Sequence, residues 1–241
     1  MKTKTIFTVL WVCVFSIAMG YMESAVVVYL RYLYYPDGFD FPMKTIDGIV
    51  AVTEIFRETA TLIMLIGIGI LAGKSAIQRF AYFILSFAVW DIFYYFFLKV
   101  LLAWPESLMT WDILFLIPVP WIGPVITPVI CALLMILLAL LIIYFVEKRG
   151  KARISAGECG LLISGSLVVI LSWIYDFIKY ALKDHSFTEL FSYSDKDEVW
   201  QIAKNYLPGC FDWWVFIGGV LIIAGGIALF AGRNIKELKK I

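Results

Sequence analysis

Six long apolar stretches constrain the fold of this chain more than any other feature of its sequence. A helix that crosses a bilayer needs roughly 20 consecutive apolar residues. The stretches are residues 5–33, 48–73, 80–103, 124–146, 157–182 and 210–232, and only short connections remain between them. A hydrophobic content of 62% agrees with such a chain. We therefore predict one integral membrane domain over residues 1–241, an all-α transmembrane bundle of about six spans.

Segment 104–128, between the third and fourth spans, departs from this pattern. Its prolines prevent a regular helix and its tryptophans favour the membrane interface. These residues are Pro118, Pro120, Pro124, Pro128, Trp104, Trp111 and Trp121. We predict an interfacial or re-entrant segment here. A second connection, 185–209, is polar and is predicted to carry a short amphipathic helix at 198–206, the alternative being a solvated loop.

The distribution of Lys and Arg predicts the orientation, because cytoplasmic loops retain positive charge. With the N-terminus in the cytoplasm, twelve basic residues lie inside and four lie outside. The inner set is Lys2, Lys4, Lys74, Arg79, Lys148, Arg149, Lys151, Arg153, Arg233, Lys236, Lys239 and Lys240, and the outer set is Lys44, Lys183, Lys196 and Lys204. We predict a multi-pass protein of the plasma (inner) membrane with both termini cytoplasmic.

The chain lacks residues that several classes of chemistry require. His185 is the only histidine, so neither a haem held by two histidines nor a histidine-rich zinc site is expected. The four cysteines show no CxxC spacing. The chain has no glycine-rich nucleotide-binding pattern and no basic patch interleaved with aromatic residues, so a nucleic-acid partner is not expected.

Ionisable residues inside the spans are the main indication of function. Each costs about 2.5–3.5 kcal/mol on insertion scales, so such residues face the bundle interior and usually have a purpose. Ten lie in the spans or near their outer ends: Glu23, Arg31, Glu54, Arg57, Glu58, Asp91, Lys99, Asp176, Lys179 and Asp212. With ~1.5 Å of rise per residue, all ten fall at mid-membrane or in the predicted outer half. Six acids and four bases leave two carboxylates uncompensated.

The second span places Glu54, Arg57 and Glu58 at i, i+3 and i+4, on one helix face. Arg57 can neutralise one carboxylate, and the others then need a proton, a metal or a ligand. Carboxylate, cation and phenol recur at one-turn spacing in the third span as Asp91, Tyr95 and Lys99, and in the fifth span as Asp176, Lys179 and Tyr180.

Three interpretations of these charges stay open. In the first, Glu54, Glu58 and Asp91 perform acid–base chemistry, and a ligand is bound by Glu23, Arg57, Tyr95, Lys99, Asp176 and Lys179. In the second, the charges are salt bridges between helices, with Arg57 paired to Glu23 or Asp91. In the third, a hard divalent cation is held by Glu23, Glu54, Glu58 and Asp91.

The apolar inner halves of the spans favour a pocket that opens outward. We expect a polar cavity that ends at the level of Glu54, Arg57 and Glu58, above a dry floor formed by residues 62–71 and 81–89. Such a pocket suits an enzyme or binding protein for a lipid-borne or extracytoplasmic small ligand. The alternatives are a proton- or cation-coupled transporter of small solutes and a non-catalytic subunit of a membrane complex or oligomer, which glycine-lined helix faces permit.

Overall fold

The computed structural model describes residues 2–44, 46–116, 119–183 and 204–240. Six helices in this part are long and apolar enough to cross a membrane. They are α1 (Thr3–Tyr34), α2 (Gly48–Ala72), α3 (Ala76–Leu102), α4 (Ile126–Arg149), α5 (Ala156–Ala181) and α8 (Trp213–Leu238). Their bounds agree with the six apolar stretches to within one or two helical turns, which confirms the predicted helical bundle.

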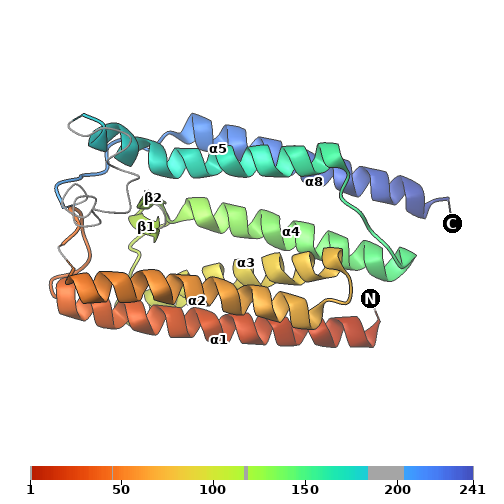
Figure 1. The fold of residues 1–241 in the computed structure, drawn as a ribbon, viewed down its shortest axis with the longest axis horizontal. Coiled ribbons are helices and arrows are strands. Elements are labelled where there is room, and N and C mark those ends of the chain that lie inside the picture. Colours follow the sequence, from red (N-terminus) through yellow and green to blue (C-terminus); the bar gives the residue numbers. More distant parts are fainter. Residues whose placement is uncertain (1, 45, 117–118, 184–203, 241) are drawn as a thin grey trace.

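The N- and C-termini lie at the same end of the bundle (Figure 1), as six crossings require. We call this the terminal end. The opposite end carries the connections after α1, α3 and α5, and we call it the hairpin end. The cytoplasmic location of the terminal end stays a prediction from the Lys and Arg distribution. The helix predicted at 198–206 lies largely outside the described residues.

Local sequence signals set the helix boundaries at the terminal end. Ser75 and Ser155 precede α3 and α5 with capping boxes, in which each hydroxyl accepts a hydrogen bond from the backbone N–H three residues later. Gly150 follows α4 with a φ of +74°, a left-handed conformation that glycine adopts without steric cost. These signals produce the short α2–α3 and α4–α5 connections.

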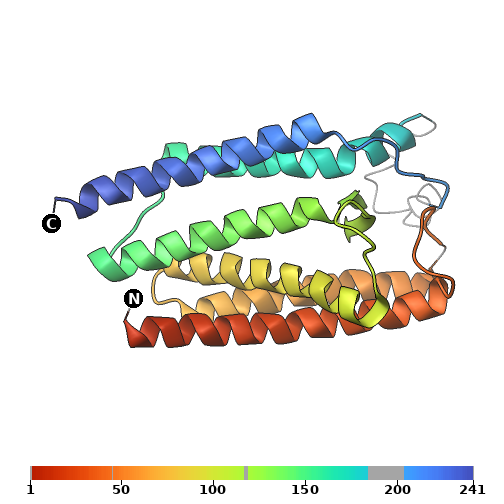
Figure 2. The ribbon, with the colours of Figure 1, turned by 180° about the vertical axis from the view of Figure 1, so that it is seen from behind.

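The helices form two groups (Figures 1 and 2). In the first group, α3 packs against α1, α2 and α4, and the second group is the pair α5 and α8. Glycine permits the close approach within this pair, because a Cβ at Gly219 would lie 2.9 Å from the carbonyl oxygen of Gly165 and 2.8 Å from a methyl of Val169. Contact between the groups is less extensive than contact within them.

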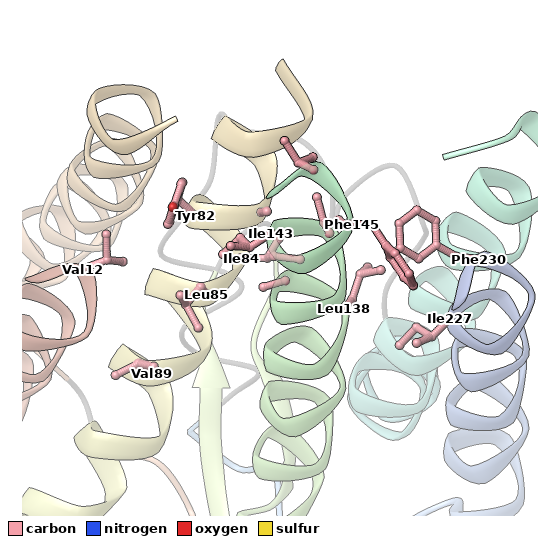
Figure 3. Close-up of a cluster of buried hydrophobic side chains, with 14 residues drawn as sticks. Val12, Tyr82, Ile84, Leu85, Val89, Leu138, Ile143, Phe145, Ile227 and Phe230 are labelled. Carbon is pink, nitrogen blue, oxygen red and sulfur yellow. The ribbon is translucent and has the colours of Figure 1, made fainter. Parts of the chain in front are cut away.

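Apolar packing joins the two groups toward the terminal end (Figure 3). The buried rings of Phe145 on α4 and Phe230 on α8 meet edge to face, with centroids 5.9 Å apart. Beyond them, Arg149 donates a hydrogen bond of 2.7 Å to Asn234. Arg233 donates two hydrogen bonds of 2.8 Å to Glu158. Rings and ion pairs together close this end of the bundle.

The segment between α3 and α4 contains an antiparallel hairpin of β1 (Trp111–Phe115) and β2 (Trp121–Pro124), in which Asp112 pairs with Gly123. The predicted departure from helix is confirmed, whereas strand pairing was not predicted. Pairing satisfies backbone groups that prolines exclude from a helix. β2 packs on α5, where the Trp121 ring stacks on Trp173 at 5.8 Å. The hairpin therefore joins the two helix groups at the hairpin end.

Candidate functional site: a cavity between the two helix groups

A cavity of about 640 Å³ lies between the helix groups and is lined by all six helices and the hairpin. Its volume falls within the roughly 300–1,000 Å³ of typical small-molecule sites. Most of its lining is apolar or aromatic. Seven Asp, Glu and Arg side chains also line it: Glu23, Arg31, Glu54, Arg57, Glu58, Asp91 and Asp112. The cavity therefore combines an apolar wall with five carboxyl groups and two guanidinium groups.

Arg57 holds two of these carboxylates. Its Nε donates to Glu54 at 2.8 Å, its Nη2 lies 2.7 Å from the same carboxylate, and its Nη1 donates across to Glu23 on α1. The hydroxyl of Thr61 donates to the second oxygen of Glu23 at 3.2 Å. This network matches the predicted salt bridge between Arg57 and Glu23. It ties α2 to α1 and leaves the Arg57 guanidinium already engaged on two sides.

Glu58 and Asp91 line the same cavity, but neither forms an ion pair with a described residue as Glu23 and Glu54 do with Arg57. The Oε2 of Glu58 is fully buried and has no hydrogen-bond partner among the described residues, while the backbone of Leu116, just beyond β1, lies beside the same carboxyl group. Asp91 makes no hydrogen bond or ion pair with any residue that the structure describes. The two carboxyl groups on α2 and α3 are thus open to a ligand, a cation or a proton.

Arg31 and Asp112 form a second charged group near the hairpin end. Arg31 Nη2 lies 3.6 Å from the Asp112 carboxylate, and its guanidinium stacks 3.6 Å above the Trp104 ring. Tyr95 donates its hydroxyl to Asp112 at 3.1 Å. Burial raises the pKa of Asp112 to about 6, although Arg31 and Tyr95 act in the opposite direction. Tyr94 lines the same cavity.

The structure brings together some of the predicted site residues and separates others. Glu23, Glu54, Arg57, Glu58, Asp91 and Tyr95 all line the cavity. Lys99 instead donates to the carbonyl oxygens of Ala103 and Pro105 at 3.0 and 2.8 Å. Asp176 accepts hydrogen bonds from the Tyr206 hydroxyl at 2.6 Å and the Gly209 amide at 3.2 Å. Lys179 is exposed. These three residues lie outside the cavity lining.

Asp112 and Tyr94 also line the cavity, although sequence reasoning did not select them. The available signal for Asp112 was a single carboxylate within the otherwise apolar run 111–117. Its partner Arg31 was among the ten membrane charges but was assigned no role. Only the return of the hairpin toward α1 and α3 brings these residues together.

The expected dry floor at the level of Glu58 was wrong in part. Leu65, Ala81 and Leu85 are buried as expected. The cavity nevertheless continues along the other side of α3 past Ile84 to Phe80, about three helical turns or ~16 Å beyond Asp91. It is closed further on, by the packing around Phe145 and Phe230. The second helix group stands away from α3 here, and a one-dimensional pattern does not reveal that separation.

This extension is almost wholly apolar, and its lining includes Leu134, Leu138, Leu162, Ile223 and Ile227. The lining reaches the exposed side chains of Phe80 on α3 and Ser166 on α5. Two indole N–H groups in the cavity wall, those of Trp90 and Trp121, have no acceptor within the described part of the chain. The cavity therefore has a polar region toward the hairpin end and an apolar region toward the terminal end.

A preformed metal site is not evident in this region. Across the described residues, no three His, Cys, Asp or Glu side chains are grouped so that they could hold a metal ion. Glu23 and Glu54, two of the four proposed ligands, point to Arg57 instead. The geometry therefore gives no support to Glu23, Glu54, Glu58 and Asp91 as a joint set of metal ligands.

No protein-family model, curated protein or solved structure matches this chain. The cavity itself is therefore the basis for a functional proposal.

Proposed function

We propose that this membrane protein binds an amphiphilic, lipid-borne or extracytoplasmic ligand in the cavity and exchanges a proton with its polar end through Glu58 and Asp91. One observation carries the proposal. A single cavity joins two carboxyl groups that form no ion pair with the described residues to a long apolar extension. Carboxyl groups of this kind suit general acid–base chemistry, and the apolar extension suits a hydrocarbon tail.

The other charged residues have supporting roles in this proposal. Glu54 and Glu23 orient Arg57 through the contacts described above. Arg57 in turn supplies positive charge next to Glu58, which follows it directly on α2. Tyr95 and Arg31 hold Asp112 at the hairpin end of the cavity. Sideways entry from the lipid phase between α3 and α5 is consistent with the exposure of Phe80 and Ser166.

The test is to identify amphiphiles that remain bound after gentle extraction, using native mass spectrometry of the purified protein. Wild type should retain a hydrophobic ligand, and Asp91→Asn or Glu58→Gln should lower its occupancy about tenfold, the lower end of the effect of losing one charge-assisted hydrogen bond. Asp212→Asn is the matched control, because Asp212 is an exposed carboxylate outside the cavity. Equal occupancy in all four proteins, or none in any, would contradict the proposal.

A proton- or cation-coupled transporter is the second candidate, and the continuation of the cavity beyond Asp91 favours it. Transport requires a route through both halves of the membrane. The packing around Phe145 and Phe230, together with the ion pairs of Arg149 and Arg233, closes the terminal end. Solute or proton flux in proteoliposomes that Asp91→Asn or Glu58→Gln abolishes would replace the binding proposal with this one.

A further inference from the structure

We infer that the ligand's polar end is cationic, so that the cavity takes a long-chain amine whose ammonium group lies between Asp91 and Glu58. This inference rests on the proposed function and specifies its ligand class. Charge is the first argument for it. Among the described residues, five carboxyl groups and two guanidinium groups line the cavity, and none of the lining residues is a lysine or a histidine. An anionic ligand would be repelled by the excess of acidic groups, whereas a cationic ligand would offset their negative charge.

The second argument is that both guanidinium groups are already engaged. Arg57 contacts two carboxylates. Arg31 contacts Asp112 and stacks on the rings of Trp104 and Phe39, 3.6 and 4.6 Å from their centroids. A phosphate or sulfate headgroup would have to displace these contacts before either arginine could bind it. The arginines therefore do not form an open anion site.

The third argument concerns the groups that are left over. Glu58 Oε2 and the Asp91 carboxyl group are acceptors that receive no hydrogen bond from any described residue. A primary ammonium carries three donors and no acceptor, which is the complement of this pair. The aromatic wall beside them, which includes Tyr94 and Tyr95, provides ring faces that also attract cations. The indole N–H groups of Trp90 and Trp121 are donors, so they offer the ammonium group no acceptor.

The apolar extension accounts for the chain of the ligand. It runs about three helical turns beyond Asp91 along α3, ~16 Å, as far as Phe80, and its walls include Leu138 and Ile227. Burial of each methylene contributes roughly 0.8 kcal/mol in transfer free energy, which is about fourfold in affinity. A short amine would leave this space empty, so affinity should rise steeply with chain length.

The test is equilibrium binding of radiolabelled dodecylamine to the protein in nanodiscs, with empty nanodiscs subtracted for partition into lipid. The amine is protonated at pH 7, since its pKa resembles that of lysine, ~10.4. We expect saturable binding of the labelled amine. Unlabelled dodecylamine should displace it at a concentration at least tenfold lower than dodecanol, dodecyl phosphate or butylamine requires. Asp91→Asn and Glu58→Gln should each raise the Kd at least tenfold, Asp91→Glu should retain binding, and Asp212→Asn should leave it unchanged.

Each other outcome has a distinct meaning. Equal displacement by dodecanol overturns the cationic headgroup but leaves the amphiphile site of the proposed function intact. Tighter binding of dodecyl phosphate overturns the inference in favour of an anion site at Arg31 or Arg57. Equal displacement by butylamine overturns the inference that the ligand has a long alkyl chain. No saturable binding of any probe overturns both the inference and the proposed function. Gel-filtration profiles of the variants show whether a loss of binding reflects a loss of folding.

Discussion

Replacement of Arg57 by leucine tests whether the network around it is structural. The variant leaves Glu23 and Glu54 facing each other without their shared cation, in side chains that are 11% and 9% exposed. Removing one partner of a buried ion pair costs about 3–5 kcal/mol. Because Arg57 is itself 21% exposed and the carboxyl groups can take up protons, we expect the lower part of that range, about 3 kcal/mol in the free energy of unfolding.

The measurement is unfolding in mixed micelles of a mild detergent and SDS, followed by tryptophan fluorescence. Lys179→Leu is the control, because Lys179 is exposed and lies outside the cavity lining; it should change the free energy by no more than about 0.5 kcal/mol. Combining Arg57→Leu with Glu23→Gln and Glu54→Gln removes the unpaired charges and should restore about 2 kcal/mol.

Two results would refute this reasoning. If Arg57→Leu is as stable as Lys179→Leu, the network contributes nothing to folding. If the triple variant is no more stable than Arg57→Leu alone, the loss comes from packing of the arginine side chain and not from the uncompensated carboxylates.

Further predictions concern other parts of the molecule. Asp91→Asn and Glu58→Gln should lose ligand binding while their free energy of unfolding falls by less than about 1 kcal/mol; a stability loss as large as that of Arg57→Leu would favour a purely structural role. Because burial raises the pKa of Asp112 to about 6, above ~3.9 in the unfolded chain, the folded state binds its proton more tightly. Wild-type stability should therefore fall by up to about 3 kcal/mol as pH rises from about 4 to about 6, and Asp112→Asn should lack this slope; parallel slopes would contradict the assignment. Gly219→Ala should cost about 1–3 kcal/mol, because its Cβ would lie 2.8–2.9 Å from α5, whereas Gly218→Ala meets open space and should be neutral. In a cysteine-free background, cysteines at Ser75 and Gly150 should be labelled only from the cytoplasmic side and one at Asp37 only from outside; the reverse would invert the predicted orientation.

The number and extent of the helices were predictable from the sequence, because the bilayer imposes a length and an apolar composition on each span independently of its neighbours. The face shared by Glu54, Arg57 and Glu58 was predictable for a similar reason, since helix geometry fixes which residues three and four apart lie together. Matching depths allowed Arg57 to pair with Glu23 or with Asp91, and the structure shows the pair with Glu23. These features depend on local periodicity and on depth alone.

The cavity was decided by tertiary structure. Depth along a helix says nothing about rotation or about which helices are neighbours, so the sequence could not separate Asp91, in the cavity, from Lys99 and Asp176, which bind the connections at the hairpin end. The hairpin brings Asp112 to Arg31 and Tyr95 through contacts distant in sequence. The cavity ends where Phe145 of α4 and Phe230 of α8 pack together. The helices α5 and α8 pack tightly on each other through Gly165 and Gly219 and stand away from α3, which leaves space for the cavity. Side-chain packing between separate helices sets that distance, and no pattern within a single helix encodes it.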